Sequence, residues 1–227
     1  MIGAPHSIRI ALLAGATGLV GRALLPQLLG SERYSRVHVL VRRAVTGIED
    51  GPKLQIHSVS FAHLPEKFPK VDDVYIALGT TIKVAGSQAA FRQVDLDFVV
   101  NTARAAQRAG AKRLAVVSAL GADAKSRVFY NQVKGEMQEA VTQLGYDSVL
   151  IVQPSLLMGD RAALGQPVRS GEVWATRLLL PVMRMVPSGV RPIRAGMVAS
   201  AMLEFTLAAK PGVRVLSSAE MQKAERV

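Results

Sequence analysis

The feature that most constrains the fold is a repeated alternation of short apolar, strand-like runs with longer segments of helical periodicity. The strand-like runs are Ile8–Ala14, Val37–Val41, Leu54–Val59, Val74–Leu78, Arg113–Ser118, Ser148–Val152 and Val213–Leu216. The helical patterns are Leu19–Leu29, Gln88–Ala109, Tyr130–Leu144, Glu172–Met185 and Ala195–Ala208. Strands that are apolar throughout belong in a parallel sheet covered by helices on both faces. We therefore predict an α/β fold with a doubly wound, Rossmann-like parallel sheet.

The length of the chain, 227 residues, suits one such domain with a sizeable core. We find no internal repeat, low-complexity run or linker, so we predict a single domain over residues 1–227. Open α/β sheets bind ligands at the carboxyl ends of their strands. Residues 155–209 follow the strand Ser148–Val152 and are expected to fold over that edge as a short C-terminal, ligand-side segment.

Composition excludes several classes of protein. The absence of cysteine rules out disulfides, thiolate catalysis and thiolate metal sites, and the four histidines show no ligand spacing, so we expect no metal site. Apolar runs stay below the roughly 18 residues that span a bilayer, and the N-terminus lacks the features of a secretory signal. We therefore predict a cytoplasmic protein without a transmembrane segment, and leave peripheral membrane contact open.

The net charge of +11 raises the hypothesis of a nucleic-acid partner. Aromatic residues make up only 5% of the chain and do not alternate with the basic ones, as they do in many nucleic-acid binders. We therefore do not expect nucleic acid to be the partner. A solvated basic surface with a site for an anionic cofactor is the favoured explanation of the charge.

A glycine-rich turn, Gly15-Ala-Thr-Gly18-Leu-Val-Gly21, joins the first strand to the first helix. Glycines allow a sharp turn and a close approach of the backbone to a pyrophosphate, and the N-terminus of the helix offers free N–H groups to the phosphates. The spacing differs from the standard G-x-G-x-x-G, and an ordinary strand–helix turn is the alternative. Its position at the first strand–helix junction favours a dinucleotide site.

The second strand ends in Arg42 and Arg43 and carries no acid. Dinucleotide folds place an acid here to bind the ribose 2′-hydroxyl of NAD, or an arginine to accommodate the 2′-phosphate of NADP. A guanidinium can form two parallel hydrogen bonds to a phosphate. The pair therefore predicts NADPH/NADP as the cofactor, with a solvated start of a loop as the alternative.

Tyr130 and Lys134 are four residues apart on a predicted helix, which places both on one face. An ammonium near a phenol favours the phenolate, so the tyrosine could act as a general acid or base. The pair alone is a weak signal, because it often marks a solvated helix face.

Ser118 ends a strand at the carboxyl edge, where its hydroxyl could hydrogen-bond a substrate carbonyl. We therefore take Ser118, Tyr130 and Lys134 as candidate catalytic residues.

The order of these motifs resembles the short-chain dehydrogenase/reductase superfamily, and within it the atypical Tat-interacting-protein-like oxidoreductases. The likeness covers about residues 8–205. Supporting stretches are Leu78-Gly-Thr-Thr81, Ser118-x-x-Gly-Ala-Asp123, Gln132-Val-Lys-Gly-Glu136, Pro154, Asp160-Arg161 and Arg169-x-Gly-Glu172. The chain departs from the pattern of the family in two places. Ser60 stands where the family often has an acid that meets the adenine, and Asn101 lies at a shifted place relative to the asparagine of the proton relay.

The resemblance implies a set of cofactor-binding residues: Gly15, Thr17, Gly18, Leu19, Val20, Gly21, Arg42, Arg43, Leu78, Gly79, Tyr130, Lys134, Pro154, Leu157 and Arg169. Residues 17–20 are expected to line the phosphates, and Leu78 and Gly79 to pass beneath the adenosine side. Tyr130 and Lys134 would contact the nicotinamide ribose. Leu157 and Arg169 would lie near the nicotinamide end.

The leading functional hypothesis is an NADPH-dependent reductase of a small carbonyl substrate, acting as a monomer or homodimer. Ser118 would orient the carbonyl oxygen, Tyr130 would donate the proton, and Lys134 would hold the ribose. The alternative is an NADPH-binding regulatory or scaffold protein with little turnover. The segment Leu156–Val186 is apolar and basic and suggests a hydrophobic or anionic substrate, whose identity the sequence does not specify.

Overall fold

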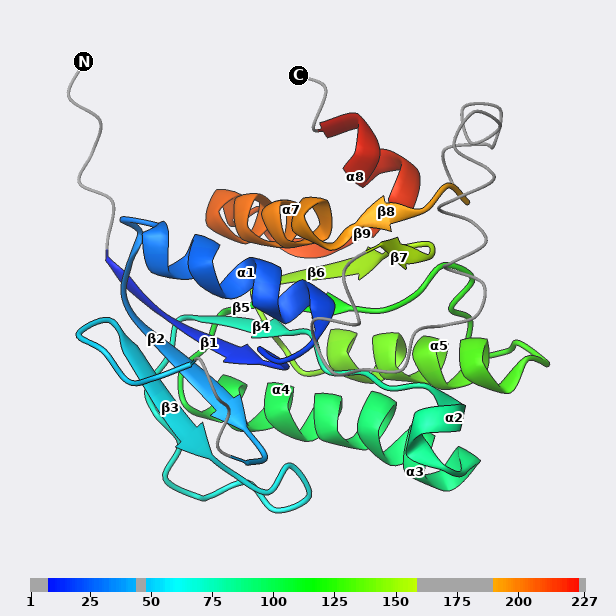
Figure 1. The fold of residues 1–227 in the computed structure, drawn as a ribbon, viewed down its shortest axis with the longest axis horizontal. Coiled ribbons are helices and arrows are strands. Elements are labelled where there is room, and N and C mark those ends of the chain that lie inside the picture. The colour runs from blue at the N-terminus through cyan, green and yellow to red at the C-terminus, as the bar shows by residue number, and fades with distance from the viewer. Residues whose placement is uncertain (1–7, 44–47, 159–189, 225–227) are drawn as a thin grey trace.

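The computed structural model describes residues 8–43, 48–158 and 190–224 (Figure 1). Its main sheet has seven strands in the order β3-β2-β1-β4-β5-β6-β9, and every neighbouring pair is parallel. The strands are β1 (Arg9–Ala14), β2 (Tyr34–Val41), β3 (Leu54–Ser58), β4 (Asp73–Ile76), β5 (Arg113–Val117), β6 (Ser148–Gln153) and β9 (Gly212–Ser217). The predicted doubly wound parallel sheet is confirmed.

Helices cover both faces of this sheet. The helices are α1 (Leu19–Gly30), α2 (Ile82–Ala85), α3 (Gln88–Arg92), α4 (Phe98–Arg108), α5 (Phe129–Thr142), α7 (Ala195–Ala208) and α8 (Ser218–Ala224). Figure 1 shows α1 and α7 on one face, and α4 and α5 on the other. Two short strands, β7 (Leu157–Met158) and β8 (Ile193–Arg194), form a second, parallel pair.

The core has two parts because the sheet buries both faces. Along β1, Leu13 belongs to the cluster beneath α1 and α7, and Leu12 to the cluster above α4 and α5. Both side chains are fully buried. Successive strand residues point to opposite faces, so a strand enclosed on both sides has no polar position in its centre. This explains the continuous apolar runs in the sequence.

Two differences from the predicted elements bear on function. The single helix expected over Gln88–Ala109 is divided into α3, a π-helical turn (Gln93–Asp97) and α4. A π-helical turn shifts the helical phase while the chain keeps its direction, and a search for one uninterrupted helical period does not detect such a shift. The helix predicted over Glu172–Met185 lies outside the described residues, as does much of the expected cover at 155–209.

The parallel arrangement gathers every carboxyl-terminal strand end at one edge of the sheet, which we call the carboxyl edge. The segments that follow β1, β2, β4, β5 and β6 begin with Gly15, Arg42, Ala77, Ser118 and Pro154. The strand order reverses between β1 and β4, which makes this the topological switch point where doubly wound sheets bind ligands. The fold therefore collects most of the predicted site residues on one side of the molecule.

Candidate active site

The glycine-rich turn owes two of its glycines to packing. Gly15 has a φ of +94°, and a Cβ there would lie 2.5 Å from the carbonyl of Ala77 at the end of β4. A Cβ on Gly21 would lie 2.1 Å from the carbonyl oxygen of Gly15. A side chain at either position would displace backbone. Helix α1 therefore packs directly on the turn, and the turn packs directly on β4.

Gly18 differs from these two because a Cβ there would make only ordinary contacts, the nearest at 3.5 Å. Gly18 is the N-cap of α1, and none of the described side chains caps this end or places an acid in the first turn. The uncapped N–H groups and the positive end of the helix dipole form an anion site. Thr17 is exposed and Leu19 half-buried beside them, while Val20 is buried. These residues fit a dinucleotide pyrophosphate.

Arg42 and Arg43 follow β2 at the same edge, and both are exposed. Neither guanidinium forms an ion pair with a residue that the structure describes. An exposed, unneutralised arginine pair keeps its hydrogen-bond donors for an anion such as a phosphate. The arrangement is compatible with the predicted contact to a 2′-phosphate.

Helix α5 carries Tyr130, Lys134 and Gln138 at a spacing of four, which places all three on one face. Tyr130 is half-buried, and its ring centroid lies 5.4 Å from that of Phe91. A Cβ on Gly135 would lie 2.0 Å from the backbone nitrogen of Ala124. The loop that follows β5 therefore packs directly against α5, close to the two predicted catalytic residues of that helix.

Ser118 is held by a residue that the sequence analysis did not identify. Its side chain is buried, and its hydroxyl accepts a hydrogen bond of 2.6 Å from Nε2 of Gln138. Gln138 in turn accepts a hydrogen bond of 3.3 Å from Gln153 at the end of β6. The signal in the sequence was the position of Gln138 one turn beyond Lys134, on the face already assigned to catalysis.

Lys134 is 4% exposed, and its ammonium lies 2.8 Å from Oδ1 of Asp95, which is 1% exposed. The second carboxylate oxygen of Asp95 accepts a 2.8 Å hydrogen bond from the backbone N–H of Thr80. Asp95 was not among the residues predicted from the sequence. The available signal was an acid at a buried position of an otherwise amphipathic helix, but such a position is recognisable only when the π-helical turn is known.

The remaining predicted residues occupy the same edge. A Cβ on Gly79 would lie 3.3 Å from Oδ1 of Asp95, so the segment after β4 passes close to the ion pair. The carbonyl of Pro154 accepts a hydrogen bond from the N–H of Leu120. Leu157 is half-buried in β7, where it pairs with Ile193. Leu78 is half-buried as well, and Arg169 lies outside the described residues.

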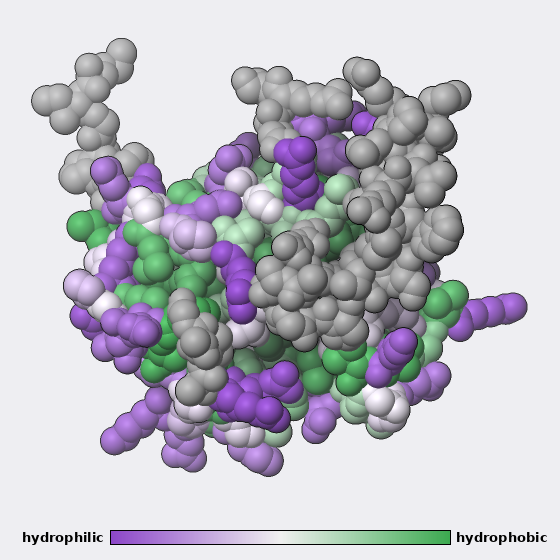
Figure 2. Space-filling view, in the orientation of Figure 1, coloured by the Kyte–Doolittle hydropathy of each residue, from purple (hydrophilic) through white to green (hydrophobic). Residues whose placement is uncertain are grey.

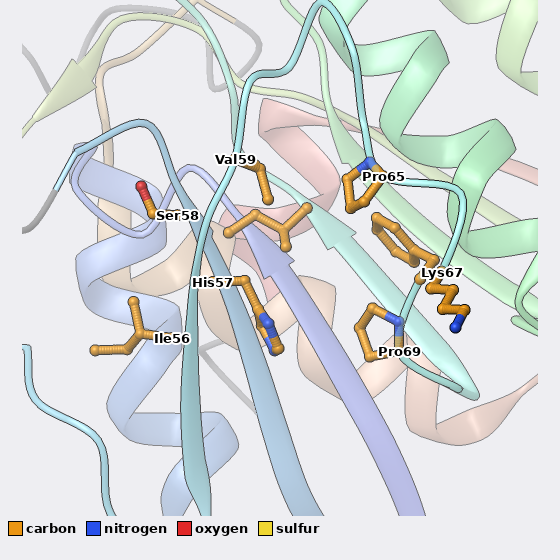
Figure 3. A pocket seen from close by; sticks show the side chains of 9 residues that line it. Ile56, His57, Ser58, Val59, Pro65, Lys67 and Pro69 are labelled. Atoms are coloured by element: carbon orange, nitrogen blue, oxygen red, sulfur yellow. The ribbon is translucent and has the colours of Figure 1, made fainter.

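A cavity of about 320 Å³ lies elsewhere, against β2 and β3 (Figure 3). His57 and the loop residues Pro65 and Pro69 line opposite sides of it. None of the residues that line it belongs to the predicted site.

In the described ranges, no helix is long and apolar enough to cross a membrane. Among the described residues, no three histidine or acidic side chains come together in a way that could hold a metal ion.

Comparison with known proteins identifies the class. A family model described as NAD(P)H-binding matches residues 15–171. The chain is 33% identical to protein HTATIP2 of Rattus norvegicus over 77% of this chain and 76% of the relative. It is 31% identical to the mitochondrial protein fmp52 of Emericella nidulans, over 66% of this chain and 67% of the relative. It also resembles the Bordetella bronchiseptica enzyme WbmG in complex with NAD, with a TM-score of 0.66, 17% identity and coverage of 98% and 77% of the two chains.

The chain is thus a protein with a Rossmann fold. It belongs to the NAD(P)H-binding family, in the atypical group of oxidoreductase-like proteins that includes HTATIP2. The resemblance predicted from the motifs is confirmed, and a nicotinamide dinucleotide is the cofactor class.

The cytoplasmic location predicted from the sequence is contradicted by these relatives. Several of them are FMP52 proteins, whose names place them in mitochondria. The prediction rested on the lack of a secretory signal and of a long apolar run. A mitochondrial address is amphipathic and basic rather than apolar, so a search for apolar runs does not separate the cytosol from this organelle.

Proposed function

We propose that the protein is an NADPH-dependent reductase of a carbonyl compound. The observation that carries this proposal is the placement of Tyr130 and Lys134 on one face of α5, with the lysine buried. The glycine-rich turn and the arginine pair Arg42 and Arg43 lie at the same edge of the sheet. A general acid and a ribose-binding lysine beside a dinucleotide site are the groups that hydride transfer to a carbonyl requires.

NADPH, when bound, supplies the hydride that adds to the carbonyl carbon. Tyr130 donates its phenolic proton to the carbonyl oxygen, so that an alcohol forms. Lys134 binds the ribose hydroxyls from the same face of α5 as Tyr130. Ser118 accepts its hydrogen bond from Gln138, and a hydroxyl that accepts keeps its own proton for donation. Ser118 can therefore donate to the carbonyl oxygen while Gln138 fixes its position.

Exposed apolar side chains support a hydrophobic carbonyl substrate. Four of the large apolar residues exposed to solvent lie in the segments after β4 and β5: Ile82, Val84, Leu120 and Val128. Figure 2 shows apolar side chains at the surface on the right of the molecule, the side to which the strands point in Figure 1. Apolar residues that gather at a ligand-binding edge contribute binding energy for an apolar molecule.

Replacing Tyr130 by phenylalanine tests the catalytic assignment. General acid catalysis contributes about 100- to 10,000-fold, so the variant should lose nearly all reduction of any accepted aldehyde or ketone. Affinity for NADPH should remain close to that of the parent, because only one hydroxyl is removed and the ring still packs near Phe91. Full activity of the variant would contradict the assignment. A parent that binds NADPH but reduces no member of a broad carbonyl panel would favour the regulatory alternative.

Calorimetric titration with NADPH and NADH tests the choice of cofactor. Arg42→Ala together with Arg43→Ala should remove most of the preference for NADPH, because hydrogen bonds to charged groups contribute about 1.5–3 kcal/mol each. Arg36→Ala is the matched control, since Arg36 is an exposed arginine earlier on the same strand. Equal affinity of the parent for the two cofactors would refute the assignment of Arg42 and Arg43.

A further inference from the structure

We propose that Asp95 is a positioning residue of the active site, which holds the ammonium of Lys134 in place for the cofactor ribose. This inference rests on the proposed role of Lys134 in binding the nicotinamide dinucleotide. The sequence left the relay asparagine of the superfamily without a clear counterpart, and Asn101 is on α4, six residues beyond Asp95. Asp95 is the residue of this helical segment that contacts Lys134.

The geometry around Asp95 joins three parts of the site. One carboxylate oxygen contacts the ammonium on α5 at 2.8 Å, and the other accepts the backbone N–H of Thr80 at 2.8 Å. Gly79 lies beside the same pair, since a Cβ there would be 3.3 Å from Asp95 and 3.9 Å from the Lys134 nitrogen. Asp95 thereby fixes the catalytic helix relative to the segment after β4, which is proposed to pass beneath the cofactor.

The π-helical turn places Asp95 where it can contact Lys134. Asp95 lies in the middle of the turn and is buried, whereas Asp97, two residues later in the same turn, is exposed. A π-helical turn inserts an extra residue into a helix and occurs frequently at functional sites. Here it coincides with a carboxylate directed at a predicted catalytic residue.

A role in stability alone does not account for the pair. Desolvation of two charges offsets much of their attraction, and apolar residues of similar volume commonly stabilise a core as well or better. The ammonium has three N–H donors, and its 2.8 Å contact with Oδ1 of Asp95 is an ion pair. Its N–H donors can therefore serve other acceptors, such as ribose hydroxyls and the Tyr130 oxygen. The carboxylate beside the ammonium orients these donors.

A double-mutant cycle on NADPH affinity, measured by calorimetry without substrate, tests the inference. Asp95→Asn should weaken NADPH binding at least about tenfold, the loss expected when a charge-assisted hydrogen bond is misplaced. In the Lys134→Met background, Asp95→Asn should have little further effect, because Asp95 acts through Lys134. Asp97→Asn, which removes an exposed carboxylate from the same π-helical turn, should bind NADPH like the parent.

The outcomes separate the inference from the proposed function. A parent that does not bind NADPH refutes the proposed function itself. NADPH binding by Asp95→Asn at parental strength, or equal losses from Asp95→Asn in both backgrounds, refutes the positioning role. Urea unfolding of each variant checks that the protein is folded. If Asp95→Asn does not fold, Asp95→Glu takes its place: it keeps the negative charge but moves it by one methylene. Weaker NADPH binding that depends on Lys134 supports the inference, and parental binding overturns it.

Discussion

Two buried aspartates occupy opposite edges of the same sheet and serve different ends. Asp73 is the first residue of β4 and lies at the amino edge, where it is fully buried. It forms ion pairs with Arg9 and Arg113, and Tyr34 donates a 2.6 Å hydrogen bond to it. Asp95 lies at the carboxyl edge, where its partners are the side chain of Lys134 and one backbone N–H.

The partners of Asp73 explain why it is structural. Arg9, Tyr34 and Arg113 are the first residues of β1, β2 and β5, so one carboxylate ties together the starts of four strands. Burial, together with the neighbouring Tyr75 and Asp73, raises the pKa of Tyr34 well above its usual value, so the phenol remains a donor. These contacts hold the starts of the strands together at the amino edge, whereas Asp95 contacts the predicted catalytic residue Lys134 at the carboxyl edge.

Removing the carboxylate at the amino edge should have the largest effect on stability. Asp73→Ala leaves two guanidinium groups without their counter-charge, and breaking a buried pair in this way costs about 3–5 kcal/mol of the free energy of unfolding. Urea unfolding measures the loss, with exposed Asp97→Ala as the control. Variant protein that remains folded should bind NADPH like the parent. A loss below about 1 kcal/mol would mean that the contacts of Asp73 with Arg9, Tyr34 and Arg113 do not stabilise the fold.

A buried histidine lies between the two edges and should dominate the response of stability to acid. Burial, and then the charges of His57 and Arg36, lower the pKa of His38 to about 4, and its side chain is one partner of a 2.8 Å hydrogen bond with His57. An unfolded histidine titrates near 6.5, so between about pH 6.5 and 4 the unfolded chain binds more protons than the folded one. Stability should therefore fall as the pH falls through this window, by up to about 3 kcal/mol.

Measuring the free energy of unfolding from pH 8 to 4 checks this expectation. His38→Leu should flatten the dependence, because it removes the titrating ring from a site that is only 5% exposed. His63→Leu is a suitable control, since His63 is exposed. An unchanged slope in His38→Leu would assign the acid response to another group, and the two edges would then be the first places to look.

Alanine substitutions of two glycines near the two ends of α1 should have the smallest effects on stability, and these effects should have opposite signs. Gly21→Ala places a Cβ 2.1 Å from the Gly15 carbonyl at the carboxyl edge, and overpacking of this kind costs about 1–3 kcal/mol. The distorted turn should also bind NADPH at least about tenfold more weakly. Gly30→Ala meets no described atom within 4 Å and should stabilise the helix by about 0.5–1 kcal/mol. Thermal unfolding and NADPH titration distinguish the two, and similar behaviour of both variants would contradict the packing role of Gly21.

Local patterns in the sequence determined much of this protein. The helix predicted over Ala195–Ala208 has those bounds in the structure, and the seven strand-like runs correspond to the seven strands of the sheet. The glycine-rich turn and the Tyr130–Lys134 pair were recognisable because both are signals at short separations, between neighbouring residues or one helical turn apart. The burial of the sheet on both faces follows from the same apolar runs.

Tertiary structure alone decided which side chains meet. Lys134 contacts Asp95 across 39 positions of the chain, and Arg9 contacts Asp73 across 64. Neither pairing has a periodic signature, because each arises where parallel strands and their covering helices are brought side by side by long crossover connections. The π-helical turn that contains the buried Asp95 is likewise not detected by a search for one uninterrupted helical period. A single sequence specifies the faces of its helices and strands, whereas the partners of its buried charges follow from how those faces are assembled.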